Sequence, residues 1–243
     1  MKMFTKDYEV KFYEVDFKNQ LKESVLLNFL QDIAAVHAEN LGFGYSFISK
    51  KNLGWFLLKY HLKVFNWPQN IDKISIKTWP KKVAKLSCLR DFEVYAPNGE
   101  KIAAVSSSWV LTDLISKKIA IPSKVLNPFE FKEVDVFETT FPKIQDVERV
   151  DLKKEIEVRY DDIDINQHVN NANYLTWALD TLDFEFRSHR TIKELEINYK
   201  KEMKYGSNVL SLVEMNDESL TTIHTLKNSD TQESICNIRI SWQ

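Results

Sequence analysis

A long amphipathic helix followed by a series of strands constrains the fold of this chain more than any other feature. Between Ser24 and Gly42 the apolar residues recur at helical spacing, with Ser24 placed to cap the start and Gly42 to end the helix. Strand-like runs follow at residues 55–64, 74–79, 86–95 and 102–111. The sequence Pro97-Asn98-Gly99, typical of a tight hairpin, joins the last two. An antiparallel sheet of this kind can bury the helix only by curling around it.

The second half of the chain repeats this order. A strand at residues 8–15 precedes the first helix, and a strand at residues 156–160 precedes a second helix at about residues 170–182. Between the halves, residues 122–149 contain three prolines, mixed charge and little periodicity, which indicates a connection over the surface. Further strand-like runs follow the second helix at residues 193–199, 208–215, 220–226 and 235–242.

A short sequence match supports the idea of a repeat. The alignment pairs Tyr13 with Tyr160 and Asn19 with Asn166, and it places Phe17 opposite Asp164 and Leu21 opposite His168. Two degenerate copies of one unit are therefore predicted, with the polar groups kept only in the second copy. Coincidence is the alternative for so short a match.

Composition and charge exclude several classes of protein. A formal net charge of −2 favours neither nucleic acid nor an anionic membrane as a partner. The N-terminal residues are too charged for a signal peptide, and the sequence has no run of about 18 apolar residues. Cys88 and Cys236 are far apart and form no metal-binding motif, so no metal ion or disulfide framework is expected. A cytoplasmic location fits these features best.

The polar loop before the second helix holds the densest group of candidate catalytic residues. Asp164, Asn166 and His168 alternate, so in an extended loop their side chains would point to the same side. Backbone N–H groups of residues 169–171, in the first helical turn, are expected to be unpaired and able to hold developing negative charge. The ordinary alternative is a helix cap made by the aspartate and asparagine beside a structural histidine.

Several stretches of the sequence resemble a known protein family. The stretch DIDINQHVNNANYL resembles the acyl-acyl-carrier-protein thioesterases, and so do LLNFLQDIAAVHAENLG, KISIKTWP, LRDFEVY and SSSWVLTD upstream. The resemblance implies an α+β fold of two tandem hotdog domains, each a long helix wrapped by a curved antiparallel sheet. The first, residues 1–125, would hold the acyl chain; residues 126–149 would link it to a catalytic domain at residues 150–243.

The resemblance also implies an activity and a set of catalytic residues. The reaction is hydrolysis of the thioester between a fatty acyl chain and the phosphopantetheine arm of acyl carrier protein, without a cofactor. Asp164, Asn166 and His168 would act with a glutamate on the strand after the second helix, which the stretch LEINYKKEM places at Glu202. The family often has a cysteine next to this glutamate, but here Met203 follows it, and a thioether cannot be such a nucleophile. Water activated by carboxylate and imidazole is therefore expected, with the base unassigned.

Several alternatives stay open at this point. An acyl-CoA thioesterase would cleave the same bond, and a non-catalytic hotdog protein would bind acyl chains without turnover. A dehydratase is less favoured, because elimination would not require the asparagine. The sequence predicts neither the preferred acyl chain nor the choice between monomer and homodimer. An acidic carrier protein needs a basic docking site, for which the candidates are Lys81, Lys82, Lys85, Arg187, Arg190, Lys200, Lys201 and Lys204.

Overall fold

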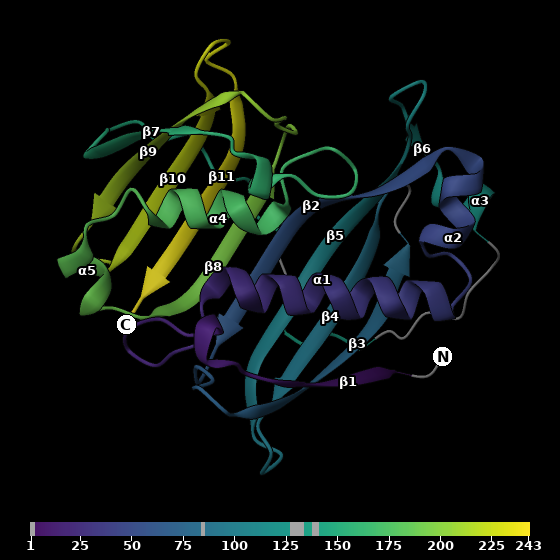
Figure 1. The fold of residues 1–243 in the computed structure, drawn as a ribbon, viewed down its shortest axis with the longest axis horizontal. Coiled ribbons are helices and arrows are strands. Elements are labelled where there is room, and N and C mark those ends of the chain that lie inside the picture. Colours follow the sequence, from purple (N-terminus) through teal and green to yellow (C-terminus); the bar gives the residue numbers. More distant parts are fainter. Residues whose placement is uncertain (1–2, 84–85, 127–133, 138–140) are drawn as a thin grey trace. The chain divides into compact units, whose positions relative to one another are not determined.

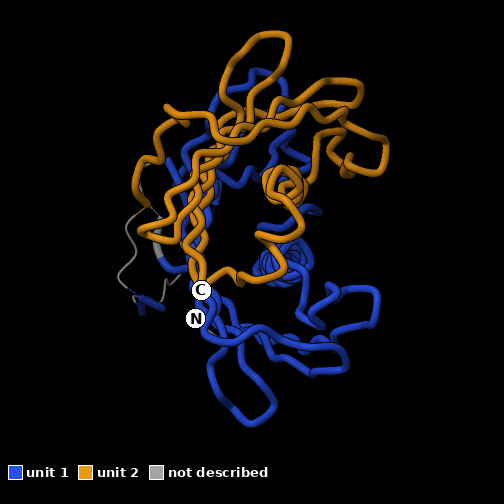
Figure 2. The backbone as a smooth tube through the Cα atoms, turned by 90° about the vertical axis from the view of Figure 1, so that its left-hand side faces the viewer, with its two compact units in different colours: residues 1–140 blue, residues 141–243 orange. Residues whose placement is uncertain are grey.

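The computed structural model describes residues 3–83, 86–126, 134–137 and 141–243 (Figure 1). The chain divides into two compact units, residues 1–140 and residues 141–243 (Figure 2). Each unit is an antiparallel sheet with a helix against one face. Within the described residues, no helix has both the length and the apolar character needed to span a bilayer.

The first unit contains one long helix and a sheet with the strand order β1-β3-β4-β5-β2. Its strands are β1 (Phe4–Glu9), β2 (Leu53–Val64), β3 (Lys73–Val83), β4 (Cys88–Tyr95), β5 (Lys101–Asp113) and β6 (Ile119–Ala120), which pairs with β5. Its helices are α1 (Glu23–Asn40), α2 (Tyr45–Ile48) and α3 (Pro122–Val125), with single turns η1 (Phe12–Glu14) and η2 (Ser49–Lys51). The four strands expected after the first helix are therefore present, and β4 and β5 form the predicted hairpin, with Gly99 at a φ of 83°.

Helix α1 forms because its apolar residues fall on one face. Leu26, Leu27, Leu30 and Ile33 are almost fully buried, and burial of each such side chain stabilises the fold by about 1.5–3 kcal/mol. The prediction that Ser24 caps this helix is wrong. The Lys22 carbonyl already accepts a hydrogen bond from the Leu26 amide (3.2 Å), so the first turn starts ahead of Ser24.

The second unit has the strand order β8-β11-β10-β9-β7. Its elements are β7 (Leu152–Glu157), η3 (Tyr160–Asp162), α4 (Asn171–Leu179), α5 (Phe184–Ser188), β8 (Ile192–Tyr199), β9 (Asn208–Asn216), β10 (Thr221–Asn228) and β11 (Ser234–Trp242). The expected helix at residues 170–182 is shorter than predicted. A separate helix, α5, follows because Asp183 caps it by accepting a hydrogen bond from the Phe186 amide (2.6 Å).

Both units contain the same loop between a single 3-10 turn and the main helix. An antiparallel bridge closes each loop, Val15 with Leu21 in the first unit and Ile163 with Val169 in the second. The residue two before the end of each bridge, Asn19 or Gln167, has a positive φ of 62° or 64°.

The predicted alignment of the two copies is therefore wrong by one residue. The bridges place Asp16, not Phe17, at the position of Asp164, and Gln20, not Leu21, at the position of His168. The first unit thus keeps the aspartate and has lost the histidine. The residue after each of these positions makes an equivalent bond: the Leu21 amide donates to the Pro68 carbonyl, and the Val169 amide donates to the Met203 carbonyl. Pro68 therefore corresponds to Met203, and the preceding residue, Trp67, corresponds to Glu202.

Candidate active site

The loop that carries Asp164 is a closed turn. One Asp164 carboxylate oxygen accepts hydrogen bonds from the backbone N–H groups of Asn166 (2.8 Å) and His168 (3.4 Å), and the Asp164 amide donates to the His168 carbonyl (2.8 Å). The Asn166 amide side chain donates to the other carboxylate oxygen (3.3 Å). The expectation of an extended loop with three side chains on one side is therefore wrong, because the aspartate folds back to hold its own turn.

His168 and Glu202 come together from segments far apart in the sequence. His168 Nε2 lies 3.1 Å from Glu202 Oε2, and the two side chains are 15% and 41% exposed. Glu202 does not lie on a strand as expected, since β8 ends at Tyr199. Its position is fixed by the loop after β8 rather than by the alternation of a strand.

Three hydrogen bonds position the loop that carries Glu202. The Val169 amide donates to the Met203 carbonyl (3.0 Å), which ties this loop to the residue after His168. The Tyr174 hydroxyl, on α4, accepts from the Met203 amide (3.0 Å) and donates to the Lys201 carbonyl (3.4 Å). Sequence reasoning missed Tyr174, and its only signal was a tyrosine within an otherwise apolar helical face.

The start of α4 is occupied by structural hydrogen bonds. Asn170 caps the helix by accepting from the Ala172 amide (2.9 Å), and its own amide donates to the Asp162 carbonyl (2.8 Å). Because the amides of Val169 and Asn170 both have protein partners, neither can bind a substrate oxygen as expected. Of the proposed donors, the exposed Asn166 side chain keeps a second N–H group for this role.

Neither cysteine has the properties of a nucleophile. Cys236 is fully buried, and burial raises the pKa of its thiol. Burial also raises the pKa of the partly exposed Cys88, to about 11. Both thiols therefore stay protonated at neutral pH. Met203, beside Glu202, is buried and 3% exposed.

Most of the candidate docking cations that can be described face carboxylates of the chain itself. Lys81, Lys200 and Lys201 form ion pairs with Asp91 (3.6 Å), Asp146 (2.8 Å) and Glu233 (2.5 Å). Arg187 lies 4.0 Å from Asp180, and Arg190 stacks over the Phe186 ring (4.2 Å). Lys85 and the side chain of Lys82 lie outside the described residues. Lys204 is exposed.

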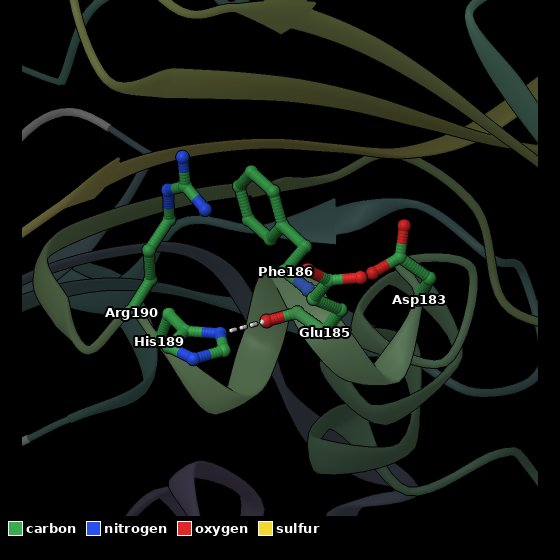
Figure 3. A pocket seen from close by; sticks show the side chains of 5 residues that line it. All are labelled: Asp183, Glu185, Phe186, His189 and Arg190. Carbon is green, nitrogen blue, oxygen red and sulfur yellow. Dashed lines mark hydrogen bonds between the residues drawn. The ribbon is translucent and has the colours of Figure 1, made fainter.

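A surface hollow beside α5 has none of the candidate catalytic residues in its lining. It has a volume of about 460 Å³ and is lined by Asp183, Glu185, Phe186, His189 and Arg190 (Figure 3). His189 Nδ1 lies 2.9 Å from the Glu185 carbonyl within the same short helix end. The lining brings together no nucleophile and base, and we assign no chemistry to it. In the described part of the chain, no cluster of three or more acidic, histidine or cysteine side chains is arranged to hold a metal ion.

Comparison with known families accounts for both units. The family model for the acyl-ACP thioesterase N-terminal domain matches residues 1–129, and the model for the C-terminal domain matches residues 145–243. The chain belongs to the acyl-ACP thioesterase family. Its catalytic candidates all lie in the stretch that matches the C-terminal domain of this family.

Two curated plant proteins of this family are similar to this chain. The palmitoyl-acyl carrier protein thioesterase of Cuphea hookeriana is 28% identical over 227 residues, covering 88% of this chain and 55% of that protein. The oleoyl-acyl carrier protein thioesterase 2 of Arabidopsis thaliana is 24% identical over 228 residues, covering 86% and 62%. The chain therefore spans about half the length of the curated relatives it matches.

Solved structures of acyl-ACP thioesterases share the fold along their full length. That of Bacteroides thetaiotaomicron is 25% identical, with a TM-score of 0.89 over 99% of this chain and 98% of that one. The 12:0-ACP thioesterase of Umbellularia californica is 21% identical, with a TM-score of 0.86 over 99% and 97%. The antiparallel sheets with few helices described above are thus the architecture of this family.

Proposed function

We propose that this protein hydrolyses fatty acyl-acyl-carrier-protein thioesters to free fatty acid and acyl carrier protein. The observation that carries the proposal is the 3.1 Å contact between His168 and Glu202, next to the Asp164 turn, in a chain whose halves match the two domains of the acyl-ACP thioesterase family. The names of these relatives, which are acyl carrier protein thioesterases, support an acyl carrier protein as the partner.

The geometry favours Glu202 as the general base. His168 Nε2 faces one Glu202 oxygen, whereas His168 Nδ1 is turned into the protein and shielded from solvent. With its proton on Nε2, the imidazole donates to that oxygen and fixes the carboxylate. The other Glu202 oxygen then accepts a proton from water at the exposed side, and the resulting hydroxide attacks the thioester carbonyl carbon. General base catalysis of this kind contributes roughly 10²- to 10⁴-fold.

Asn166 is the donor for the carbonyl oxygen in this mechanism. One of its two N–H groups bonds to Asp164, and the second belongs to an exposed side chain and stays available to a substrate oxygen. Asp164 acts as a positioning residue, because its carboxylate holds the turn between Asn166 and His168. One such donor contributes roughly 10²- to 10³-fold. Collapse of the tetrahedral intermediate expels the phosphopantetheine thiolate, which takes up the proton from Glu202.

The proposed function goes with a fold type and a division of labour between the two units. Each unit is a hotdog domain, and the division at residues 1–125, 126–149 and 150–243 separates an acyl-binding domain from a catalytic one. The loss of the histidine and glutamate counterparts at Gln20 and Trp67 supports a non-catalytic first unit. We further infer a cytoplasmic enzyme that needs no cofactor and acts as a monomer or homodimer.

A comparison of carriers tests the proposal. Steady-state kinetics with the same acyl chain on acyl carrier protein and on coenzyme A should give the higher kcat/KM for the carrier protein. A higher value for coenzyme A would replace the proposal by an acyl-CoA thioesterase. If neither substrate releases free fatty acid, the protein is an acyl-binding member of the fold without turnover.

A further inference from the structure

A buried arginine without a counter-ion lies under α1 in the first unit. Arg90, on β4, is 6% exposed, and its guanidinium donates to His37 Nδ1 (3.1 Å) and Thr78 Oγ1 (3.1 Å). The adjacent Asp91 points to the other face of the sheet, where Ser106 donates to it (2.6 Å). Among the described residues, no carboxylate forms an ion pair with Arg90.

The two acceptors of Arg90 are neutral. Burial, with the nearby guanidinium, lowers the pKa of His37 to about 4, so the imidazole is uncharged at neutral pH and can accept at Nδ1. Burial lowers the pKa of Arg90 only to about 10, so the guanidinium keeps its charge. A buried cation held by neutral groups alone is costly, and an anion that pairs with it removes most of that cost.

A buried hydroxyl without a hydrogen-bond partner lies in the same row of the sheet. Tyr60, on β2, is 1% exposed, and its hydroxyl has no hydrogen-bond partner in the described part of the protein. Tyr60 is directly opposite Ser107 on β5, and Ser107 is directly opposite Arg90 on β4, so all three share the face that packs against α1. Burial raises the pKa of Tyr60, which keeps the hydroxyl protonated and able to donate.

The neighbouring row on this face is more open. Cys88 pairs with Trp109 across β4 and β5, two residues along from Arg90 and Ser107, and both side chains are only partly buried. The Trp109 indole donates to the Ser107 hydroxyl (2.8 Å), which joins the two rows. The buried row of Arg90 and Tyr60 thus lies beside a row on the same face, Cys88 and Trp109, that is apolar and partly accessible.

We propose that Arg90 and Tyr60 form a binding site for a carboxylate at the end of an alkyl chain. A guanidinium and a phenolic hydroxyl are both donors, and charge-assisted bonds to a carboxylate are the strongest that they can make. An alcohol or a plain chain would leave the guanidinium without a counter-ion. The inference rests on the proposed acyl-binding role of the first unit. The carboxylate can come from the released fatty acid or from an acyl chain that ends in a second carboxyl group.

Calorimetric titration of the full chain with octanoate and 1-octanol tests the site itself. The carboxylate should bind about 10- to 100-fold more tightly than the alcohol, as expected for charge-assisted hydrogen bonds. Arg90→Met and Tyr60→Phe should each remove most of this preference and leave binding of 1-octanol nearly unchanged. Equal affinities in the wild-type protein, or a preference that survives both variants, would overturn the proposal.

Two controls keep the test independent of the catalytic proposal. His168→Ala should keep the full preference for octanoate, because His168 belongs to the second unit and the titration needs no turnover. Tyr60→Phe removes one oxygen atom only, so it still reads the site if Arg90→Met fails to fold. Should the protein prove inactive on acyl carrier protein, the proposed function fails while the titration still decides this inference.

Kinetics distinguish the two sources of the carboxylate. Suberyl- and octanoyl-acyl-carrier-protein carry acyl chains of equal length, but the suberyl chain ends in a carboxylate. If the site binds the end of the acyl chain, the suberyl substrate should have the higher kcat/KM. Arg90→Met should reverse that order. If the site binds released fatty acid, octanoate should inhibit wild-type hydrolysis more strongly than that of Arg90→Met, with no advantage for the suberyl chain. If neither effect is seen and octanoate and 1-octanol bind equally, Arg90 is a structural residue only and the proposed site is wrong.

Discussion

The residue after Glu202 decides between two chemistries. Met203 is buried, its carbonyl accepts from Val169, and its sulfur lies 3.7 Å from the Asn228 amide nitrogen. It therefore packs and positions the loop, and its thioether takes no part in bond making. Glu202 is the more exposed member of the pair with His168, which fits its proposed role in activating water.

Restoring a cysteine at this position tests whether a thiol adds anything. Met203→Cys should leave kcat within about twofold of the wild-type value, because in the proposed mechanism water activated by Glu202 remains the nucleophile. The smaller side chain should lower the free energy of unfolding by about 1–3 kcal/mol. Steady-state kinetics and urea denaturation measure the two effects. A large gain in kcat, with a trapped acyl-enzyme, would instead show that a thiol can take over the reaction.

At the scale of elements, the turn held by an aspartate is a structural feature of both units, so its presence alone does not indicate catalysis. Asp16 accepts from the amides of Lys18 (2.9 Å) and Gln20 (2.9 Å), as Asp164 accepts from those of Asn166 and His168. The turn is the same in both units, and only the second supports a histidine. Structure and catalysis can therefore be separated by matched variants.

Asp16→Ala and Asp164→Ala should destabilise the protein to a similar extent. Each removes two backbone hydrogen bonds to a carboxylate, and we expect a loss of about 1–3 kcal/mol in the free energy of unfolding. Only Asp164→Ala should also lower kcat, because it releases Asn166 and His168. Urea denaturation and kinetics on the same preparations provide the comparison. An equal fall in kcat for Asp16→Ala would show that the activity loss reflects stability alone.

Two buried histidines should make stability depend on pH. Burial lowers the folded-state pKa of His37 to about 4 and that of His224 to about 3, below the value of about 6.5 in an unfolded chain. Between these values the unfolded state binds more protons. The free energy of unfolding should therefore fall as the pH drops below about 6.5, by up to about 1.4 kcal/mol per pH unit for each histidine.

A variant isolates one of these contributions. His37→Gln keeps an acceptor for Arg90 but does not titrate, so its stability should fall less steeply between pH 6.5 and 5. Urea denaturation at a series of pH values gives both slopes. Parallel curves for the wild-type protein and the variant would contradict the assigned protonation of His37.

Element types were predictable where periodicity is long, and loops were not. The strands after each helix and the α1 pattern follow from apolar spacing, and Pro97-Asn98-Gly99 specified its hairpin. The error of one residue in aligning the copies has a physical cause. The position with a positive φ is Asn19 in one loop and Gln167 in the other, so aligning Asn19 with Asn166 shifted the two copies by one residue. The family motif indicated Asp164, Asn166, His168 and Glu202, but only tertiary structure reveals Tyr174 and the occupied amides of Val169 and Asn170 before α4.

At the scale of the whole molecule, positive and negative charges nearly balance. Attraction of a charged partner therefore depends on which basic side chains are already paired with carboxylates more than on the net charge. The net charge is −2, and most of the candidate docking cations that can be described already face carboxylates of the chain. Attraction of an acidic carrier protein should then be moderate and easily screened. KM for acyl-acyl-carrier-protein should rise several-fold between about 50 and 300 mM NaCl, with kcat unchanged.

A charge reversal locates part of this attraction. Lys204→Glu should raise KM for the carrier-protein substrate, because Lys204 is exposed and lies two residues from Glu202. KM for the matched acyl-CoA should change less. A KM that is the same at both salt concentrations and in this variant would place the docking surface elsewhere.

The most direct test of the account is the hydrolysis of acyl-acyl-carrier-protein by His168→Ala and Glu202→Gln. The wild-type protein should release free fatty acid, and each variant should lower kcat by at least about 100-fold, since each removes the base or the group that fixes it. Urea denaturation should show that both variants remain folded. Near-normal kcat in either folded variant would contradict the assignment of the His168–Glu202 pair as the catalytic centre.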